Sequence, residues 1–351
     1  MTHTHYTLIM LFVAGLVAFA ATPLVGKLAA FIGAIDVPQD ERRMHKQPIP
    51  RLGGLAVFAG FIIAVLGMYA LTEQLVMDWT LVWMLIGAVM IVVIGVIDDI
   101  KRLTAWVKFP VQVAAALIAV LGGAVIEGFS NPFVDGAFVE LGIFAVPISV
   151  IWIVGMTNAI NFIDGLDGLS VGVSAIGAIT IFIVAAMKGN WQIALLMAAL
   201  VGGTLGFLPY NVNPASMFVG DTGATFLGFV LGAVSIMGLF KFTAIVSFAV
   251  PLLILGLPLF DMLFSIVRRI RAGKSPMEAD RSHVHHKLID MGFSQKQSVS
   301  ILYAVSAVLS IAAVVLAAFD EVRALIFLLA VMAVLGVAAW VIVTLRRNRR
   351  L

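Results

Sequence analysis

Long apolar stretches, separated by short polar segments, follow one another along almost the whole chain. Most of them reach the length of about 20 residues that a helix needs to cross a bilayer. They predict an all-α integral membrane protein with about eleven transmembrane helices, and because the fifth, seventh and eighth stretches are short, ten is the nearest alternative. The expected spans are Tyr6–Ala30, Leu52–Thr72, Trp79–Ile97, Val107–Ile126, Gly142–Asn158, Leu169–Met187, Trp191–Leu208, Gly223–Leu239, Thr243–Val267, Val299–Phe319 and Val322–Leu345.

The composition agrees with this pattern. Of the 351 residues, 62% are hydrophobic and only 12% are charged, whereas soluble domains carry about 25% charged residues. There is no cysteine, which excludes disulfide bonds and thiol chemistry.

Lysine and arginine are concentrated in the loops that follow odd-numbered spans and in the C-terminal tail. Since basic loops stay in the cytoplasm, the N-terminus is expected outside and the C-terminus inside. The net charge of +3 is explained by this asymmetry, and no nucleic-acid-binding surface is needed. On the outer side, Asp135-Gly136 within Phe133–Leu141 predicts a small β-hairpin.

The whole chain, residues 1–351, is expected to form one membrane domain whose chemistry lies in cytoplasmic loops. These loops are residues 36–51, 98–108, 158–168, 210–222 and 268–298. The last loop carries helix signals, with Ser275-Pro276 at a start and Gly292 at an end.

Five aspartates, all placed at cytoplasmic ends of apolar spans, are the main indication of a site. A carboxylate near bilayer depth is costly and therefore indicates function. Five acids on one face would repel one another unless a cation lay among them. The pattern predicts a metal-dependent site acting on an anionic compound, formed by Asp98, Asp99, Asp164, Asp167 and Asp221.

Two of the five acids belong to the polar segment Asn158–Gly168. There, four polar residues recur at three-residue spacing, which keeps their oxygens near one face of a helix or 3₁₀ turn. Such oxygens suit Mg²⁺ or Mn²⁺. A helix cap followed by a turn is the alternative, although one cap needs only one such residue. The four are Asn158, Asn161, Asp164 and Asp167.

Asp221 lies where a span begins and is flanked by small residues. It can act as a helix N-cap and as a metal ligand at once. Gly220, Ala224, Gly228 and Gly232 recur at every fourth residue, which favours close helix packing. The cap and the packing together would hold Asp221 rigidly.

The remaining polar segments are basic. His283, His285 and His286 follow Arg281; they favour binding of a phosphate or sugar over zinc, because no cysteine completes a zinc site, and a solvated loop is the alternative. Lys108 follows the Asp98-Asp99 pair. Asp261, inside the ninth span, is expected to pair with an arginine of the following loop.

Taken together, the chain resembles the polyprenyl-phosphate N-acetylhexosamine-1-phosphate transferase family. The resemblance covers nearly the whole chain, and its motifs occur in the family's order. The His-x-His-His form at His283–His286 looks like the GlcNAc branch, because the MurNAc-pentapeptide branch carries three consecutive histidines. The motifs are His45–Gly54, Asp98-Asp99, Asn158–Gly168, Phe218–Gly223 and Arg281–His286.

The resemblance implies transfer of GlcNAc 1-phosphate from UDP-GlcNAc to undecaprenyl phosphate at the cytoplasmic face of the bacterial plasma membrane. It implies that Asn161 and Asp221 hold Mg²⁺, or Mn²⁺, and that Phe218 stacks on uracil. Asp98, Asp99, Asp164 and Lys108 are the candidate catalytic residues, with Asp98 and Lys108 handling the lipid phosphate. The candidate substrate-binding residues are Lys46, Asn158, Asp167, Phe218, Arg281, His283, His285 and His286.

Several alternatives stay open at this point. The donor could carry GalNAc, the reaction could pass through an aspartyl intermediate, and the protein could be a homodimer. The rival class is an ion-coupled transporter with an acidic site on the cytoplasmic side. Its acids should lie near mid-membrane, whereas here only Asp261 is placed deeper than the span ends.

Overall fold

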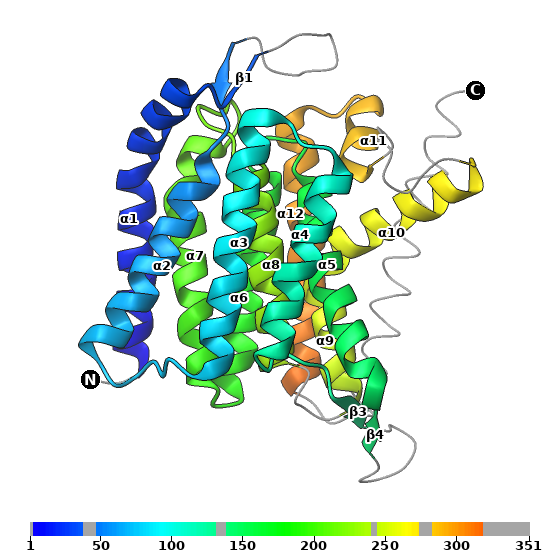
Figure 1. Ribbon diagram of the computed structural model, residues 1–351. Coiled ribbons are helices and arrows are strands. Elements are labelled where there is room, and N and C mark those ends of the chain that lie inside the picture. The colour runs from blue at the N-terminus through cyan, green and yellow to red at the C-terminus, as the bar shows by residue number, and fades with distance from the viewer. Residues whose placement is uncertain (1–2, 38–46, 131–137, 240–243, 274–282, 319–351) are drawn as a thin grey trace.

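A computed structural model describes residues 3–37, 47–130, 138–239, 244–273 and 283–318. Within these residues the protein is a helical bundle with two small pairs of strands (Figure 1). The helices are α1 His3–Ile32, α2 Gly53–Leu71, α3 Trp79–Lys101, α4 Ala105–Leu121, α5 Ala145–Ile163, α6 Leu169–Met187, α7 Trp191–Asn211, α8 Gly220–Gly238, α9 Ala244–Ile254, α10 Gly256–Arg271, α11 Val284–Asp290 and α12 Gln295–Ala318, with a short 3₁₀ helix at Gly142–Phe144.

Eight of the described helices are long and apolar enough to cross a membrane, and α4 is an apolar helix of 17 residues. An all-α membrane protein is therefore confirmed. The last predicted span, Val322–Leu345, lies outside the described residues, so the count of eleven stays a prediction.

The ninth predicted span, Thr243–Val267, is corrected by the structure. It forms two helices, α9 and α10, which meet at Leu255. Pro258 lacks the N–H that a continuous helix would use to bond the carbonyl of Ile254. The chain is thus free to change direction, and α10 leaves the bundle at an angle (Figure 1).

The centre of the bundle is α8, which packs against α2, α3, α5 and α6 and is buried along nearly its whole length. Its small residues permit this close packing, as the spacing of small residues along the sequence predicted. A Cβ on Gly228 would lie 2.5 Å from the carbonyl oxygen of Met156 on α5, and one on Gly223 would lie 2.6 Å from Cα of Gly54 on α2. α8 therefore has close backbone contacts with both α5 and α2.

The two strand pairs lie at opposite ends of the bundle (Figure 1). At one end, β1 Ile35–Asp36 pairs with β2 Ile49–Pro50. At the other end, β3 Gly128–Ser130 pairs with β4 Phe138–Glu140. The expected turn at Asp135-Gly136 lies outside the described residues, so the predicted hairpin and its outer location stay predictions.

The end of the bundle that carries β1 also carries α11 and the turn between α3 and α4. Gly292, with a φ of 88°, follows α11 as the expected helix end. The expected start at Ser275-Pro276 lies outside the described residues. The loops predicted to carry the chemistry, so far as they are described, therefore share one end of the molecule.

Candidate active site

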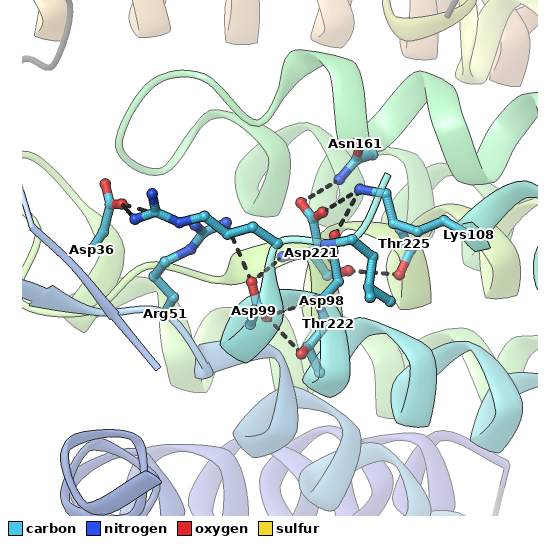
Figure 2. A network of polar contacts seen from close by, with 11 residues as sticks. Asp36, Arg51, Asp98, Asp99, Lys108, Asn161, Asp221, Thr222 and Thr225 are labelled. Atoms are coloured by element: carbon cyan, nitrogen blue, oxygen red, sulfur yellow. Dashed lines mark hydrogen bonds and ion pairs between the residues drawn. The ribbon is translucent and has the colours of Figure 1, made fainter. Parts of the chain in front are cut away.

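A polar cluster at this end of the bundle brings together four residues that the sequence analysis selected (Figure 2). The Lys108 ammonium lies 2.6 Å from Asp98 Oδ2 and 2.8 Å from Asp221 Oδ2. The Asn161 amide donates to Asp221 Oδ1 at 2.9 Å. Residues from α3, α4, α5 and α8 thus converge on one carboxylate, that of Asp221.

The turn between α3 and α4 holds Asp98 and Lys108 in reach of each other. Arg102 ends α3 in the left-handed region, with a φ of 52°, and the chain reverses there. The N–H of Leu103 then donates to Asp98 Oδ1 at 2.6 Å. Both oxygens of Asp98 are engaged, one by this turn and one by Lys108.

Asp99 faces the other way and binds the start of α8 with both of its oxygens. Its Oδ1 accepts from the N–H of Asp221 at 2.9 Å, and its Oδ2 accepts from the N–H and the hydroxyl of Thr222 at 3.0 and 2.7 Å. The Asp-Asp pair is therefore divided, since Asp98 faces the lysine and Asp99 binds the helix start.

A cavity of about 930 Å³ adjoins this cluster, a volume within the usual range of about 300–1,000 Å³ for small-molecule sites. Gly220, next to Asp221 in the chain, forms part of its wall. Four predicted site residues line it as well, namely Asp164, Asp167, Phe218 and His286, together with Arg51 of the His45–Gly54 motif.

Inside the cavity wall, Asp167 is tied to the loop before α8. Its Oδ2 accepts from the Asn213 amide at 2.8 Å and from the N–H of Ala215 at 3.1 Å. The same Asn213 amide reaches Gln295 Oε1 at 2.8 Å, which connects this loop to α12. One oxygen of Asp167 is thereby fixed, so its orientation is set before any ligand arrives.

Asp164 and Ser170 form a second fixed pair, because the Ser170 hydroxyl donates to Asp164 Oδ1. Burial raises the pKa of Asp164 to about 7. The carboxyl thus retains a proton far closer to neutral pH than an ordinary aspartic acid does.

The histidine segment approaches from the side of α10. Nδ1 of His283 lies 2.9 Å from Asp261 Oδ2, and the N–H of Val284 donates to Asp261 Oδ1 at 2.8 Å. The prediction that Asp261 pairs with an arginine is wrong within the described residues, because the start of α11 packs against α10 and presents these two donors first. His285 packs directly over Gly165, and burial, together with the neighbouring His286, lowers the pKa of His285 to about 3.

Other predicted site residues lie away from both the Asp221 cluster and the cavity wall, or outside the described residues. Asn158 lies one turn deeper in α5 and donates to Gln112 Oε1 at 2.7 Å, so its predicted role in substrate binding stays a prediction. Lys46 and Arg281 lie outside the described residues.

Sequence reasoning missed Asp36 and the part that Arg51 plays. Arg51 Nη2 lies 3.4 Å from Asp99 Oδ1, and its Nη1 lies 3.8 Å from Asp36 Oδ1 (Figure 2). Arg51 belongs to a run of basic residues that looks like an orientation signal. Asp36 follows an apolar span without any neighbouring motif, so no pattern in the sequence selects it.

The donor atoms fit a hard divalent cation better than zinc. Asp221 and Asn161 carry carboxylate and amide oxygens, which are the ligand type that Mg²⁺ and Mn²⁺ prefer. Among the described residues, no group of three His, Cys, Asp or Glu side chains is arranged to hold a metal by itself. This agrees with magnesium sites in which one or two carboxylates are completed by substrate phosphates and water.

Comparisons with known proteins agree on one family. Residues 81–239 match the family model described as glycosyl transferase family 4. The chain is 44% identical over 296 residues to a probable undecaprenyl-phosphate N-acetylglucosaminyl 1-phosphate transferase of Bacillus subtilis, a match that covers 84% of this chain and 80% of the relative.

More distant relatives carry related names. A decaprenyl-phosphate N-acetylglucosaminephosphotransferase of Mycolicibacterium smegmatis is 34% identical, over 83% of this chain and 77% of its own length. An undecaprenyl-phosphate alpha-N-acetylglucosaminyl 1-phosphate transferase of Escherichia coli K12 is 28% identical, over 81% and 77% of the two chains.

Proposed function

Because the chain belongs to the polyprenyl-phosphate N-acetylhexosamine-1-phosphate transferases of glycosyl transferase family 4, we propose that it transfers GlcNAc 1-phosphate from UDP-GlcNAc to undecaprenyl phosphate. The products would be GlcNAc-diphospho-undecaprenol and UMP. The relatives' names support the acceptor class and the sugar. The observation that carries the proposal is the convergence of Lys108, Asn161 and Asp98 on Asp221 beside a cavity of about 930 Å³.

In this reaction an oxygen of the lipid phosphate attacks the donor phosphorus that carries GlcNAc, and the bond from that phosphorus to the UMP oxygen breaks. The acceptor is a phosphate monoester whose second pKa is about 6, so it is largely deprotonated at neutral pH. The chain therefore needs no strong general base. Its main tasks are to hold two anions in line and to reduce their repulsion.

In this proposal Lys108 binds the acceptor phosphate. Its ammonium lies between Asp98 and Asp221, so an incoming phosphate would exchange one of these partners without moving the lysine far. Asp98 holds the lysine and is itself held by the N–H of Leu103. Because both oxygens of Asp98 are engaged, this geometry favours a single displacement over attack by an aspartate.

Asp221 and Asn161 would hold the divalent cation, which when bound neutralises charge on the donor diphosphate. The Asn161 amide now donates to Asp221; rotation of the side chain would turn its oxygen toward the ion instead. Excess carboxylate charge around Lys108 favours this occupancy.

The cavity is the proposed donor site. Phe218 lines it and offers an aromatic face for a base, while Asp167 lines it with one oxygen already fixed by Asn213. His286 also lines it, and it is close in the chain to His283 and His285. We assign His283 and His285 to the support of this wall, and we place the active site on the cytoplasmic face of the plasma membrane.

The test is release of UMP by the purified protein. We expect release from UDP-GlcNAc that requires undecaprenyl phosphate, stops with EDTA and returns with Mg²⁺. UDP-GalNAc and UDP-glucose in parallel assays define the sugar. Release without a lipid acceptor, or none under any of these conditions, would reject the proposal, and uptake of a solute by protein in liposomes would favour the transporter.

The orientation has its own test. Glu140 on β4 and Asp290 on α11 are exposed acids near opposite ends of the bundle. Since the chain has no native cysteine, Glu140→Cys and Asp290→Cys each introduce a single thiol. In intact cells an impermeant thiol reagent should label position 140 and spare position 290; equal labelling would contradict the predicted topology.

A further inference from the structure

Arg51 is a partly buried cation that has no role so far in the proposed reaction. Arg51 follows β2, and its guanidinium lies between Asp36 on β1 and Asp99 on α3 (Figure 2). The backbone around Arg51 is held by hydrogen bonds as well. Its N–H donates to the carbonyl of Ala34 at 3.0 Å, and the carbonyl of the preceding Pro50 accepts from Phe218 at 2.8 Å.

The partner of Arg51, Asp99, caps a helix to which it does not belong. The residue that precedes α8 is Val219, whose side chain has no cap hydrogen bond. Helix starts leave N–H groups unsatisfied, and a carboxylate there is favourable. Asp99 supplies this carboxylate from α3, through its bonds to the N–H groups of Asp221 and Thr222.

Close contact at Gly220 shows how tightly these parts fit. Gly220 has a φ of 71°, and a Cβ there would lie 1.9 Å from the carbonyl oxygen of Arg51 and 2.4 Å from Asp99 Oδ2. The side chain of Asp99 has no exposed surface. A charge buried in this way needs a partner, and Arg51 is the cation that reaches it from the cavity side.

We propose that Arg51 is a positioning residue for the transfer reaction, which acts on Asp221 through Asp99. Arg51 pairs with the buried Asp99 and is itself oriented by Asp36. Asp99 then fixes the first turn of α8, and so places the Asp221 carboxylate beside Lys108 and Asn161. The inference rests on the proposed function, since it assigns Asp221 to the divalent cation.

The chain offers matched variants. Arg51→Lys keeps the charge but loses the fork that reaches Asp36 and Asp99 together. Asp36→Asn removes the charge of the second partner of Arg51 and leaves Asp99 in place. Arg102→Lys is the control. Arg102 also lies near Asp36, at 3.7 Å, but among the described residues it forms no ion pair with Asp99.

The first measurement is hydrogen exchange of the peptide that covers residues 218–225. Arg51→Lys should increase exchange at the start of α8 by at least about tenfold and leave the rest of α8 unchanged, since local opening differs from global unfolding. Asp36→Asn should act in the same direction with a smaller effect, and Arg102→Lys should match the wild type. Increased exchange throughout the bundle, or none at α8, would overturn the proposal.

The second measurement is calorimetric binding of UDP-GlcNAc, without a lipid acceptor, in EDTA and in Mg²⁺. Arg51→Lys should leave binding in EDTA within about twofold and should lose most of the increase that Mg²⁺ gives, with kcat falling at least tenfold and KM little changed. The double variant Arg51→Lys with Asp36→Asn should be no worse than Arg51→Lys alone, because both act through one contact.

The outcomes separate the inference from the function it rests on. If Arg51→Lys weakens binding equally in EDTA and in Mg²⁺, Arg51 contacts the donor directly and the proposal is wrong. If the wild type neither binds UDP-GlcNAc nor releases UMP, the proposed function fails, and the exchange experiment still decides whether Arg51 orders the start of α8.

Discussion

Two helix starts border the candidate site, and each is capped by an acid from another helix. At α8, Asp99 of α3 accepts from two backbone N–H groups and from the Thr222 hydroxyl. At α11, Asp261 of α10 accepts from the N–H of Val284 and pairs with the His283 ring. The same device thus fixes Asp221 on one wall and the histidines on the other.

The surroundings of the two caps differ. The start of α8 lies in the centre of the bundle, with α2, α3 and α5 packed around it. The helix that carries Asp261, α10, leaves the bundle (Figure 1). It exposes the apolar side chains of Phe260, Leu263, Phe264 and Val267. The wall with Asp221 is therefore preorganised by the fold, whereas on the histidine wall the start of α11 is held by the two contacts with Asp261.

The largest effect is expected from Asp221→Asn, on the preorganised wall. The amide has the same shape, but it loses the charge that faces Lys108 and the cation. Transfer should fall on the order of 10³-fold or more, while the melting temperature stays close to that of the wild type. UMP release measures the effect.

Thr225→Val is the control for this variant. The Thr225 hydroxyl donates to the backbone carbonyl of Asp221 at 2.6 Å, so its loss perturbs the same turn and spares the carboxylate. Turnover of Thr225→Val should stay within about tenfold. Near-normal turnover of Asp221→Asn would show that Asp221 is only a helix cap.

Lys108→Met should have the next largest effect. A charged hydrogen bond is worth about 1.5–3 kcal/mol, which corresponds to roughly ten- to hundredfold in kcat/KM for the lipid acceptor. Binding of UDP-GlcNAc should remain nearly intact. The exposed Lys101, changed to Met, is the matched control.

A change of less than about twofold in acceptor kinetics for Lys108→Met, under about 0.5 kcal/mol, would contradict this role. It would reduce Lys108 to a lysine that extends to the membrane interface.

On the histidine wall, Asp261→Asn and His283→Ala should each reduce transfer by about tenfold and leave UMP binding within about twofold. Both changes break the same pair, so the double variant should be no worse than the more severe single variant. Additive losses would mean that His283 contacts a substrate directly. A proportional loss of UMP affinity would instead place the histidines at the base.

The sequence located the acids well because polar residues are rare in apolar spans. Asp98, Asp221 and Asn161 stood out for this reason, and the structure brings them within one cluster. It could not divide the Asp98-Asp99 pair: adjacent residues on a helix point in different directions, but only the packed neighbours decide what each side chain contacts. The pairing of Asp36 with Arg51 also depends on β1 and β2 meeting across a loop, which no periodicity reports.

Two predictions were wrong for the same reason, because each relied on what is adjacent in the sequence and could not include contacts made by the folded chain. The ninth span was predicted as one helix because its apolar pattern continues through Pro258, and only the direction of α10 shows the break. Asp261 was assigned an arginine because arginines are its nearest cations in sequence. Its actual partner, His283, lies 22 residues further along the chain.

The smallest effects concern stability and pH, and the two walls should respond in opposite directions. The folded-state pKa of Asp164, about 7, is above its ordinary value of about 3.9. Between these values the folded chain keeps a proton that the unfolded chain has lost, so stability falls as pH rises toward 7. Asn at position 164 cannot titrate, so the stability of Asp164→Asn relative to the wild type should increase between pH 5.5 and pH 8.

His285 gives the opposite sign. Its folded-state pKa of about 3 is below the ordinary value of about 6.5, so below pH 6.5 the unfolded chain binds a proton that the folded chain does not. The wild type therefore loses stability as pH falls, and the stability of His285→Gln relative to the wild type should increase at low pH. Each difference should be on the order of 1–2 kcal/mol, or a few degrees in Tm. Melting curves at half-unit steps from pH 5 to 8 measure how the Tm difference between each variant and the wild type changes with pH. Slopes of equal sign for the two variants, or a Tm difference for Asp164→Asn that does not change with pH, would contradict the burial of one of these groups. The Tm of the double variant should depend less on pH than that of the wild type, because it carries neither titrating group.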